Sequence, residues 1–268
     1  MLKDMTLGQY YPVNSPVHKM DARIKILIAL AFMVFIFCIN TVYGYVALFV
    51  FTMFMIFVSK IPFKFMLKAI KPILFFVVFT AILNIFLTKS GTVVWNYGFI
   101  TITDMGILNA VYMMIRIVFL IMGTSLLTYT TSPIELTEGM ERLLRPFSKI
   151  GLPSHELAMM MSIALRFIPT ILEETDKIKK AQTARGADFE SGNILKRAKA
   201  LIPLLVPLFI SAFRRADELA MAMECRCYHG GKNRTKMNRS RMGARDFVAV
   251  LLFLVFATSV VVTNIFFG

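Results

Sequence analysis

A run of apolar residues from Ile26 to Ser59 constrains the fold of this chain more than any other feature. A helix needs about 20 apolar residues to cross a bilayer, within a range of roughly 17 to 25. The 34 residues of this run (26–59) are too many for one ordinary span, and only the segment "INTVYG" interrupts them. We therefore predict two short membrane-spanning helices, with a turn near Asn40–Gly44.

Three further apolar segments are long enough to span a bilayer: about 70–88, 106–129 and 247–267. The composition agrees, because 57% of the 268 residues are hydrophobic and only 17% are charged. A soluble domain usually carries about a quarter charged residues. The sequence therefore predicts an all-α polytopic membrane protein with about five transmembrane helices.

Lysine and arginine flank these spans unevenly, and such residues stay on the cytoplasmic side. Those that precede the first span or separate the second from the third are Lys3, Lys19, Arg23, Lys25, Lys60, Lys64, Lys68 and Lys71. None lies between the first two spans, and the loop between the third and fourth has only Lys89. We expect the N-terminus inside the cell and the C-terminus outside.

A long segment between the fourth and fifth spans, about 131–245, holds most of the chain's 30 lysines and arginines. Helical apolar periodicity persists through it, so we predict three cytoplasmic helices. The first opens with Ser132 followed by Glu135, the pattern of a capping box, and should end at Pro146. The predicted domains are a membrane domain (1–130), a cytoplasmic domain (131–245) and a C-terminal transmembrane helix (246–268).

The second cytoplasmic helix should begin at Ser154 and the third near Ser191. Gly186 and Gly230–Gly231 stand where glycine caps would end them. The apolar stretch 201–213 in the third helix is too short to span, so it should lie along the membrane surface or pack on another helix.

These two helices end alike, in "AQTARG" and in "AMECRCYHGG". One arginine at a helix C-terminus has a plain structural explanation, because it complements the helix dipole by about 0.3–1 kcal/mol. Two matched arginines suggest docking, since a guanidinium group presents a rigid fork of five donors to acidic side chains or carbonyls. The candidate site residues are Ala184, Arg185, Gly186, Cys225, Arg226 and Cys227.

Over nearly its whole length, the chain resembles the transmembrane T component of energy-coupling factor (ECF) transporters. The resemblance includes "SPVHKMDARIKI", "TTSPIEL" and "MMMSIALRFIPTILEE", and it is most specific in "AQTARGADF" and "PLFISAFRRADELAMAMECRCY". In that family the T component joins two cytoplasmic ABC-type ATPases to a membrane-embedded S component that captures a vitamin or metal ion.

The resemblance implies a bacterial cytoplasmic membrane protein whose three cytoplasmic helices are coupling helices. Each arginine motif would dock in a groove of one ATPase, and ATP and magnesium would bind to those partners rather than to this chain. The second motif departs from the family pattern, because Cys225 and Cys227 replace the usual small residues such as Ala and Gly. This departure bears on how closely the backbone beside Arg226 can approach a partner.

Other functions fit the residues less well. Cys225, Cys227 and His229 supply only three closely spaced ligands, whereas a structural zinc site needs four. No phosphate-binding loop or catalytic motif is present, so we expect a non-enzymatic subunit. The basic run 230–245 directly precedes a span, which favours anionic lipid over nucleic acid as its neighbour.

Arg116 lies inside the fourth span, where a charge is costly. We interpret it as a tie between helices, to Asn84 or to backbone carbonyls. A self-contained secondary carrier or channel remains the alternative function. Such a protein would be expected to show intramembrane acids or paired repeats, and Arg116 is the only internal charge of the five predicted spans.

Overall fold

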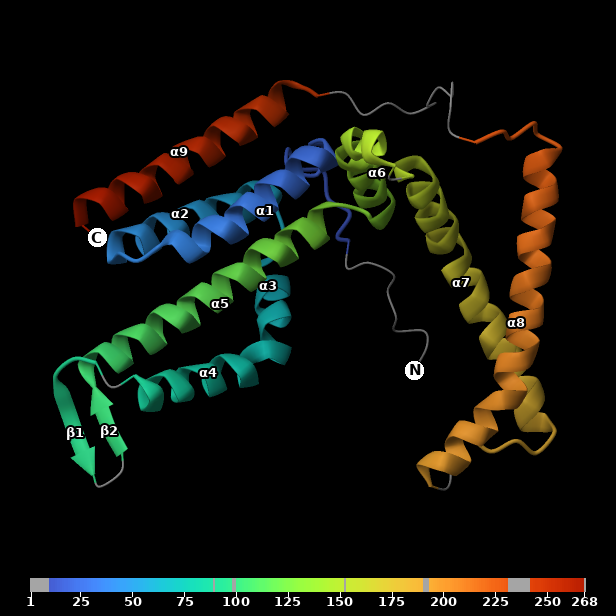
Figure 1. The fold of residues 1–268 in the computed structure, drawn as a ribbon, viewed down its shortest axis with the longest axis horizontal. Helices are drawn as coiled ribbons and strands as arrows, with labels where there is room; N and C mark the ends of the chain where they lie inside the picture. The colour runs from blue at the N-terminus through green and yellow to red at the C-terminus, as the bar shows by residue number, and fades with distance from the viewer. Residues whose placement is uncertain are drawn as a thin grey trace. The chain divides into compact units, whose positions relative to one another are not determined.

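The computed structural model describes residues 10–88, 90–97, 100–151, 153–189, 193–230 and 242–267. This part of the chain is predominantly helical, as predicted, and contains one antiparallel hairpin (Figure 1). Two 3-10 segments, Lys71–Ile73 and Arg145–Ile150, adjoin the helices. The elements are α1 (Ala22–Cys38), α2 (Val42–Ser59), α3 (Phe63–Ile70), α4 (Leu74–Leu87), β1 (Val93–Tyr97), β2 (Ile100–Thr103), α5 (Asp104–Thr130), α6 (Pro133–Leu144), α7 (Ser154–Ala184), α8 (Ile194–Glu224) and α9 (Ala244–Phe267).

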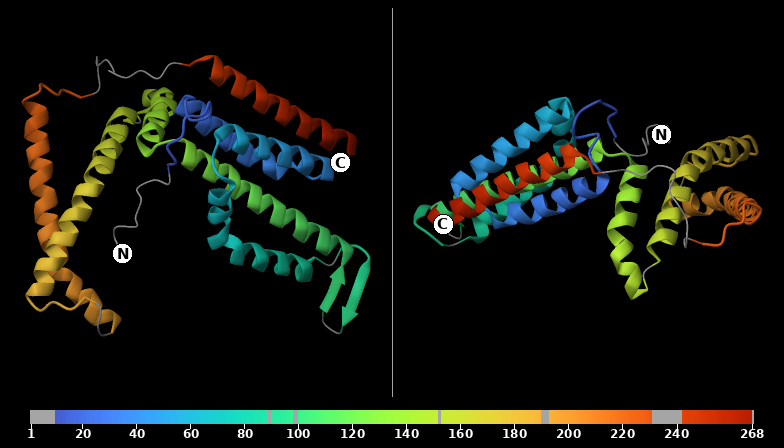
Figure 2. Two further views of the ribbon diagram at one scale, coloured as in Figure 1. Left: turned by 180° about the vertical axis from the view of Figure 1, so that it is seen from behind. Right: turned by 90° about the horizontal axis from the view of Figure 1, so that it is seen from above.

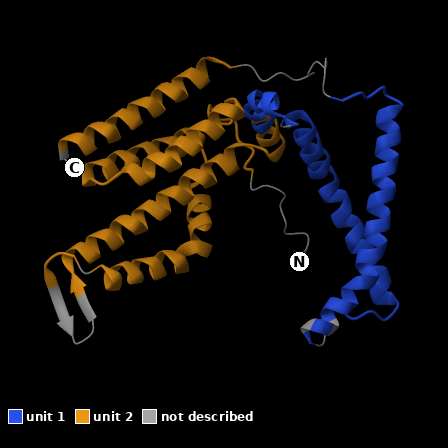
Figure 3. Cartoon of the chain, viewed as in Figure 1, with its two compact units in different colours: residues 1–6, 140–238 blue, residues 7–139, 239–268 orange. Residues whose placement is uncertain are grey.

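The chain divides into two compact units, 7–139 with 239–268 and 1–6 with 140–238 (Figure 3). We call the described residues of the first the membrane unit and those of the second the α7–α8 unit. The division between them falls within α6. The predicted domains separate membrane segments from cytoplasmic ones, whereas these units are defined by contacts within the chain. The predicted domain limits therefore stay a prediction.

The long apolar run folds as two helices, α1 and α2, which confirms the predicted split. Thr41 caps the N-terminus of α2, where its hydroxyl accepts a hydrogen bond from the backbone N–H of Gly44 at 3.3 Å. The 17 residues of α1 reach about 25 Å, which is the short end of what can cross a bilayer.

Among the described residues, five helices are long and apolar enough to cross a membrane: Val42–Ser59, Phe63–Leu87, Asp104–Thr130, Ser154–Ala184 and Ala244–Phe266. Four of these helices coincide with predicted spans. The remaining predicted span is α1, which is too short to be counted among the five. The remaining helix of the five is α7, which was not predicted to span and is the least apolar of them. It carries Arg166, Glu173 and Glu174 along its length, and such charges are costly in a bilayer. The cytoplasmic placement of α7 stays a prediction.

The core of the membrane unit lies between α1, α2, α5 and α9, which run side by side (Figures 1 and 2). Aromatic rings fill it, and Phe51 stacks on Phe256 with a centroid distance of 4.5 Å. Close packing requires a glycine at position 123, because a Cβ atom there would lie 2.4 Å from the ring of Phe32. Apolar burial therefore holds α9 against helices that precede it by about 200 residues in sequence.

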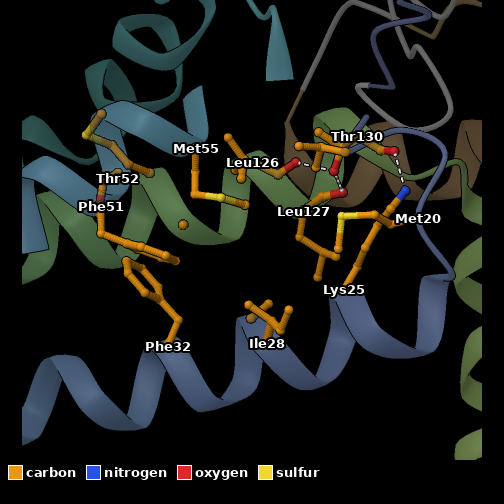
Figure 4. Close-up of a pocket in the computed structure, with 14 residues that line it drawn as sticks. Met20, Lys25, Ile28, Phe32, Phe51, Thr52, Met55, Leu126, Leu127 and Thr130 are labelled. Atoms are coloured by element: carbon orange, nitrogen blue, oxygen red, sulfur yellow. Dashed lines mark hydrogen bonds between the residues drawn. The ribbon is translucent and has the colours of Figure 1, made fainter. Parts of the chain in front are cut away.

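A cavity of about 60 Å³ lies within the membrane unit between α1, α2 and α5 (Figure 4). Apolar side chains such as Ile28, Phe32 and Met55 line it, and the Lys25 side chain extends past them toward Thr130 (Figure 4).

A β-hairpin joins α4 to α5 where the sequence analysis expected only a connecting loop. Its strands pair antiparallel, with Val93 opposite Thr103 and Tyr97 opposite Ile100. The two strands read "VVWNY" and "ITIT", and β-branched and aromatic residues favour extended pairing.

Candidate functional site

Helices α7 and α8 pack against each other as an antiparallel pair. For the 201–213 stretch of α8, the sequence had predicted either this packing on another helix or a position along the membrane surface. The Gln182 side-chain amide donates to the carbonyl of Pro203 at 3.3 Å. That carbonyl is free because Pro207, four residues later in the helix, has no N–H to donate to it. A residue of α7 thus satisfies a carbonyl that the proline leaves unpaired in α8.

A second contact joins the same helices eight residues away. The Ser211 hydroxyl donates to Glu174, and the Arg215 guanidinium donates to the other carboxylate oxygen of Glu174 at 2.9 and 3.2 Å. We call these three residues the Glu174 clamp. Moving back eight residues on α7, from Gln182 to Glu174, moves the contact forward eight residues on α8, from Pro203 to Ser211. This register makes the pair antiparallel.

Helix α7 ends at the first predicted motif in a Schellman arrangement. Gly186 has φ +87°, its N–H donates to Thr183 O at 3.0 Å, and the N–H of Ala187 donates to Gln182 O at 3.0 Å. These bonds satisfy carbonyls of the last turn that would otherwise lack partners. The prediction that Gly186 caps this helix is confirmed.

Helix α8 ends with the same pattern of bonds around the second motif. Cys227 has φ +55°, its N–H donates to Glu224 O at 2.8 Å, and the N–H of Tyr228 donates to Met223 O at 3.0 Å. Cys227 therefore takes the position of Gly186, and Arg226 takes that of Arg185. The prediction that Gly230–Gly231 would cap this helix was wrong, because the left-handed residue that closes the last turn comes three positions earlier; Gly231 lies outside the described residues.

All six motif residues are exposed, and both cysteines are free thiols. Arg185 follows Glu174 by eleven residues, and Arg226 follows Arg215 by eleven, so each arginine lies about 16 Å beyond the clamp along its own helix. Because the helices are antiparallel, the two arginines occupy opposite ends of the pair. By the observed register Arg185 lies opposite position 200, so 26 residues (226 − 200), or roughly 40 Å of helix, separate it from Arg226.

Arg116 lies in α5 and donates to the carbonyl of Ile39 at 2.9 Å and to the Tyr45 hydroxyl at 3.3 Å. Ile39 follows α1 and Tyr45 belongs to α2, so the guanidinium joins the α1–α2 connection to α5. Of the two partners that the sequence suggested, Arg116 contacts a backbone carbonyl, whereas Asn84 donates to Thr80 of its own helix at 2.9 Å.

Sequence reasoning missed a buried polar cluster at one end of the membrane unit. The Lys25 amine donates to the carbonyls of His18 and Thr130, each at 3.0 Å. His18 Nε2 lies 2.9 Å from the Tyr11 carbonyl, and its Nδ1 lies 2.7 Å from the Ser15 hydroxyl. The neutral ring with its hydrogen on Nε2 satisfies both contacts. Burial is the main cause that lowers the pKa of His18, and the charge of Lys25 adds to it.

The same cluster extends to the first turn of α9. Asp246 accepts from the backbone N–H of Asp21 and from that of Gly243, both at 2.8 Å. Asp21 in turn caps α1 and pairs with Arg23 at 2.8 Å. The signal was present in "SPVHKMDARIKI", whose polar residues precede a span. Nothing local, however, indicates that the partner of Asp21 follows it by 225 residues.

No group of three potential metal ligands occurs within the described ranges. His155 lies 3.1 Å from Glu141, a contact within the α7–α8 unit.

The Ser132–Glu135 capping box is confirmed, with reciprocal hydrogen bonds of 3.4 and 3.3 Å.

The chain is similar to known proteins over most of its length. The family described as "Cobalt transport protein" (CbiQ) matches residues 13–237. A protein named "Energy-coupling factor transporter transmembrane protein EcfT" from Clostridium kluyveri is 55% identical over 269 residues, covering 100% of both chains. A protein of the same name from Ruminiclostridium cellulolyticum is 55% identical and covers 100% of both chains. Another of that name, from Bacillus subtilis, is 47% identical over 96% of this chain and 97% of its own.

Proposed function

This chain belongs to the CbiQ family and to the EcfT transmembrane proteins of energy-coupling factor transporters, and on that premise we propose that it is the scaffold that couples ATP hydrolysis to uptake. Two ABC-type ATPases would dock on the ends of α7 and α8, and ATP and Mg²⁺ would bind to those ATPases. Their closure would move a membrane-embedded S component that carries a vitamin or a metal ion. The chain itself is a multi-pass membrane protein without a catalytic role in this scheme.

The observation that carries the proposal is the equivalence of the two arginine ends. Both arginines are exposed, each precedes a left-handed residue, and the same two backbone bonds close each helix. Each also lies eleven residues beyond the Glu174 clamp. An antiparallel pair of this kind has approximate two-fold symmetry, so it offers equivalent contacts to two related subunits.

The chemistry of the two ends fits docking in a groove. A guanidinium group can pair bidentately with a carboxylate or with carbonyls, and such contacts fix orientation as well as supplying affinity. The flanking residues Ala184 and Gly186 are small, so the helix end can approach a partner closely. At the other end Cys225 and Cys227 are larger but equally exposed.

The test is charge reversal at both ends. Arg185→Glu with Arg226→Glu should abolish co-purification of the ATPases and abolish uptake. In this proposal the guanidinium groups bind carboxylate or carbonyl oxygens of the ATPases, and those oxygens would repel the new glutamate carboxylates. The matched control is Lys180→Glu with Arg214→Glu, which makes the same charge change at exposed positions of α7 and α8. Co-purification by the double arginine variant at the level of the control variant would refute the proposal.

A conservative variant separates geometry from charge. Arg185→Lys with Arg226→Lys keeps the charge but loses the fork, and we expect ATPase docking to weaken while membrane insertion stays normal. Cys225→Ser with Cys227→Ser should leave assembly nearly normal, because in this proposal the thiols hold no metal. Loss of assembly together with loss of a stoichiometric bound metal would overturn that assignment.

A further inference from the structure

Helix α3 lies between two membrane-spanning helices but is not needed to cross the bilayer. The 3-10 segment Lys71–Ile73 and the 14 residues of α4 together extend about 27 Å, close to the roughly 30 Å of a hydrocarbon core. The chain turns at Pro72, which removes a backbone donor and disfavours helix in the residue before it. Figure 1 shows α3 running steeply across the direction of α4 and α5. The segment from Lys71 onward is therefore long enough to form the predicted span 70–88 by itself, which leaves α3 at one end of that span within the longer apolar range Phe63–Leu87.

One face of α3 carries a row of lysines. Lys64, Lys68 and Lys71 follow one another at spacings of four and three residues, so they fall within roughly 60° of the helix circumference. Lys60 adds a fourth charge at the left-handed turn that ends α2. All four side chains are exposed, and in the part of the chain that the structure describes none has a hydrogen-bond or ion-pair partner.

Acidic residues to neutralise this row are absent from the neighbouring sequence. No aspartate or glutamate occurs between Asp21 and Asp104, a stretch that includes α1 to α4 and the hairpin. Asp21 already pairs with Arg23 in the buried cluster. The four positive charges therefore face the surroundings of the protein.

An apolar row lies beside the lysines on the same short helix. Phe63 and Leu67 are 47% and 52% exposed, whereas Met66 on the inner face is fully buried. The Tyr129 hydroxyl of α5 donates to the Phe65 carbonyl at 3.3 Å, which holds the inner face in place. A helix with a basic row and an exposed apolar row, held at the end of a span, matches the form of an interfacial lipid-binding helix.

We propose that α3 is a binding surface for anionic phospholipids of the cytoplasmic leaflet. The lysine ammonium groups contact headgroup phosphates, and Phe63 and Leu67 enter the boundary between headgroups and acyl chains. This surface does not depend on the arginine motifs, because it lies in the membrane unit and they lie in the α7–α8 unit. It would make the membrane unit prefer phosphatidylglycerol over phosphatidylcholine.

The experiment measures binding of short-chain phosphatidylglycerol and phosphatidylcholine to the purified full chain in neutral detergent micelles. We expect tighter binding of phosphatidylglycerol that weakens as salt is added. Each lysine near an anionic headgroup contributes about a five-fold factor, so Lys64→Gln with Lys68→Gln should weaken phosphatidylglycerol binding by about 25-fold. The control Lys177→Gln with Lys180→Gln changes the same charge on exposed residues of α7 and should have little effect.

Lys64→Arg with Lys68→Arg keeps the charge and should retain binding, which separates a lipid surface from a folding defect. Equal binding of the two lipids by the unmodified chain would overturn the proposal. Unchanged phosphatidylglycerol binding in Lys64→Gln with Lys68→Gln would overturn it as well, as would an equal loss in the α7 control. Binding of glycerol phosphate as tight as that of phosphatidylglycerol would show a free-phosphate site and would also contradict it.

Discussion

The matched ends of α7 and α8 predict opposite effects for two substitutions at equivalent positions. In Gly186→Ala the new Cβ atom meets nothing within 4 Å, so the backbone conformation alone decides the effect. A left-handed φ costs an L-residue about 1–2 kcal/mol, and the lower freedom of alanine in the open state offsets roughly 0.4–1 kcal/mol of that. The net loss is about 1 kcal/mol at the end of α7. Cys227→Gly reverses both contributions and should strengthen the end of α8 by a similar amount.

Hydrogen exchange of the full chain in lipid nanodiscs measures both changes, because amide exchange follows the local opening equilibrium. Gly186→Ala should speed exchange in a peptide covering the end of α7 by about five-fold, and Cys227→Gly should slow it at the end of α8 by about five-fold. Gly243→Ala is the control, since this glycine lacks a left-handed φ and its added Cβ atom also meets nothing within 4 Å. Slower exchange in Gly186→Ala, or faster exchange in Cys227→Gly, would refute the assigned caps.

Three further predictions concern contacts between side chains within the two units. Gly123→Ala should lower the free energy of unfolding by about 1–3 kcal/mol, because its Cβ atom would overlap the Phe32 ring, and a thermal melt in detergent checks this. The ion pair of Glu174 with Arg215 is partly exposed, so a double-mutant cycle with glutamine at each position should give a coupling of at most about 1 kcal/mol. The pKa of His18 is lowered in the folded chain, so near the ordinary histidine pKa of about 6.5 the unfolded chain binds more protons than the folded one. The free energy of unfolding should therefore fall as pH drops from 7.5 to 5.5. Thermal melts of His18→Gln across that range should show a shallower pH dependence.

Each of these expectations has a clear contrary result. An unchanged melting temperature in Gly123→Ala would mean that α1 and α5 can separate without loss of stability. A coupling well above about 1 kcal/mol between Glu174 and Arg215 would contradict the view that solvent screens this partly exposed pair. A pH dependence that is identical in the unmodified chain and in His18→Gln would remove His18 as its source.

Local patterns in the sequence were enough for several features. Apolar length predicted the spans and the division of 26–59 into α1 and α2, because burial in lipid depends on composition over one continuous segment. The Ser132–Glu135 capping box was equally predictable, since its donors and acceptors are three residues apart. The hairpin between α4 and α5 was missed because the apolar and basic patterns used for topology ignore β-propensity in short loops.

The cap of α8 shows where local reasoning failed. Gly230 favours a left-handed conformation by itself, but the hydrogen bonds of the last turn close at Cys227. Glycine lowers the energy of such a turn without deciding where the helix ends, and a cysteine can take the position at a cost of about 1–2 kcal/mol. The equivalence of Cys227 and Gly186 therefore became visible only from the backbone bonds.

By itself, the amino-acid sequence determined that this protein crosses a membrane and that it presents two arginines at successive helix ends. Only the tertiary structure decided how those ends relate, through Glu174, Ser211 and Arg215, and how Asp246 closes the cluster around Asp21. The physical reason is sequence separation. Contacts between residues 37 to 225 positions apart depend on which helices pack together, and that depends on the summed burial of whole helix faces rather than on any local pattern.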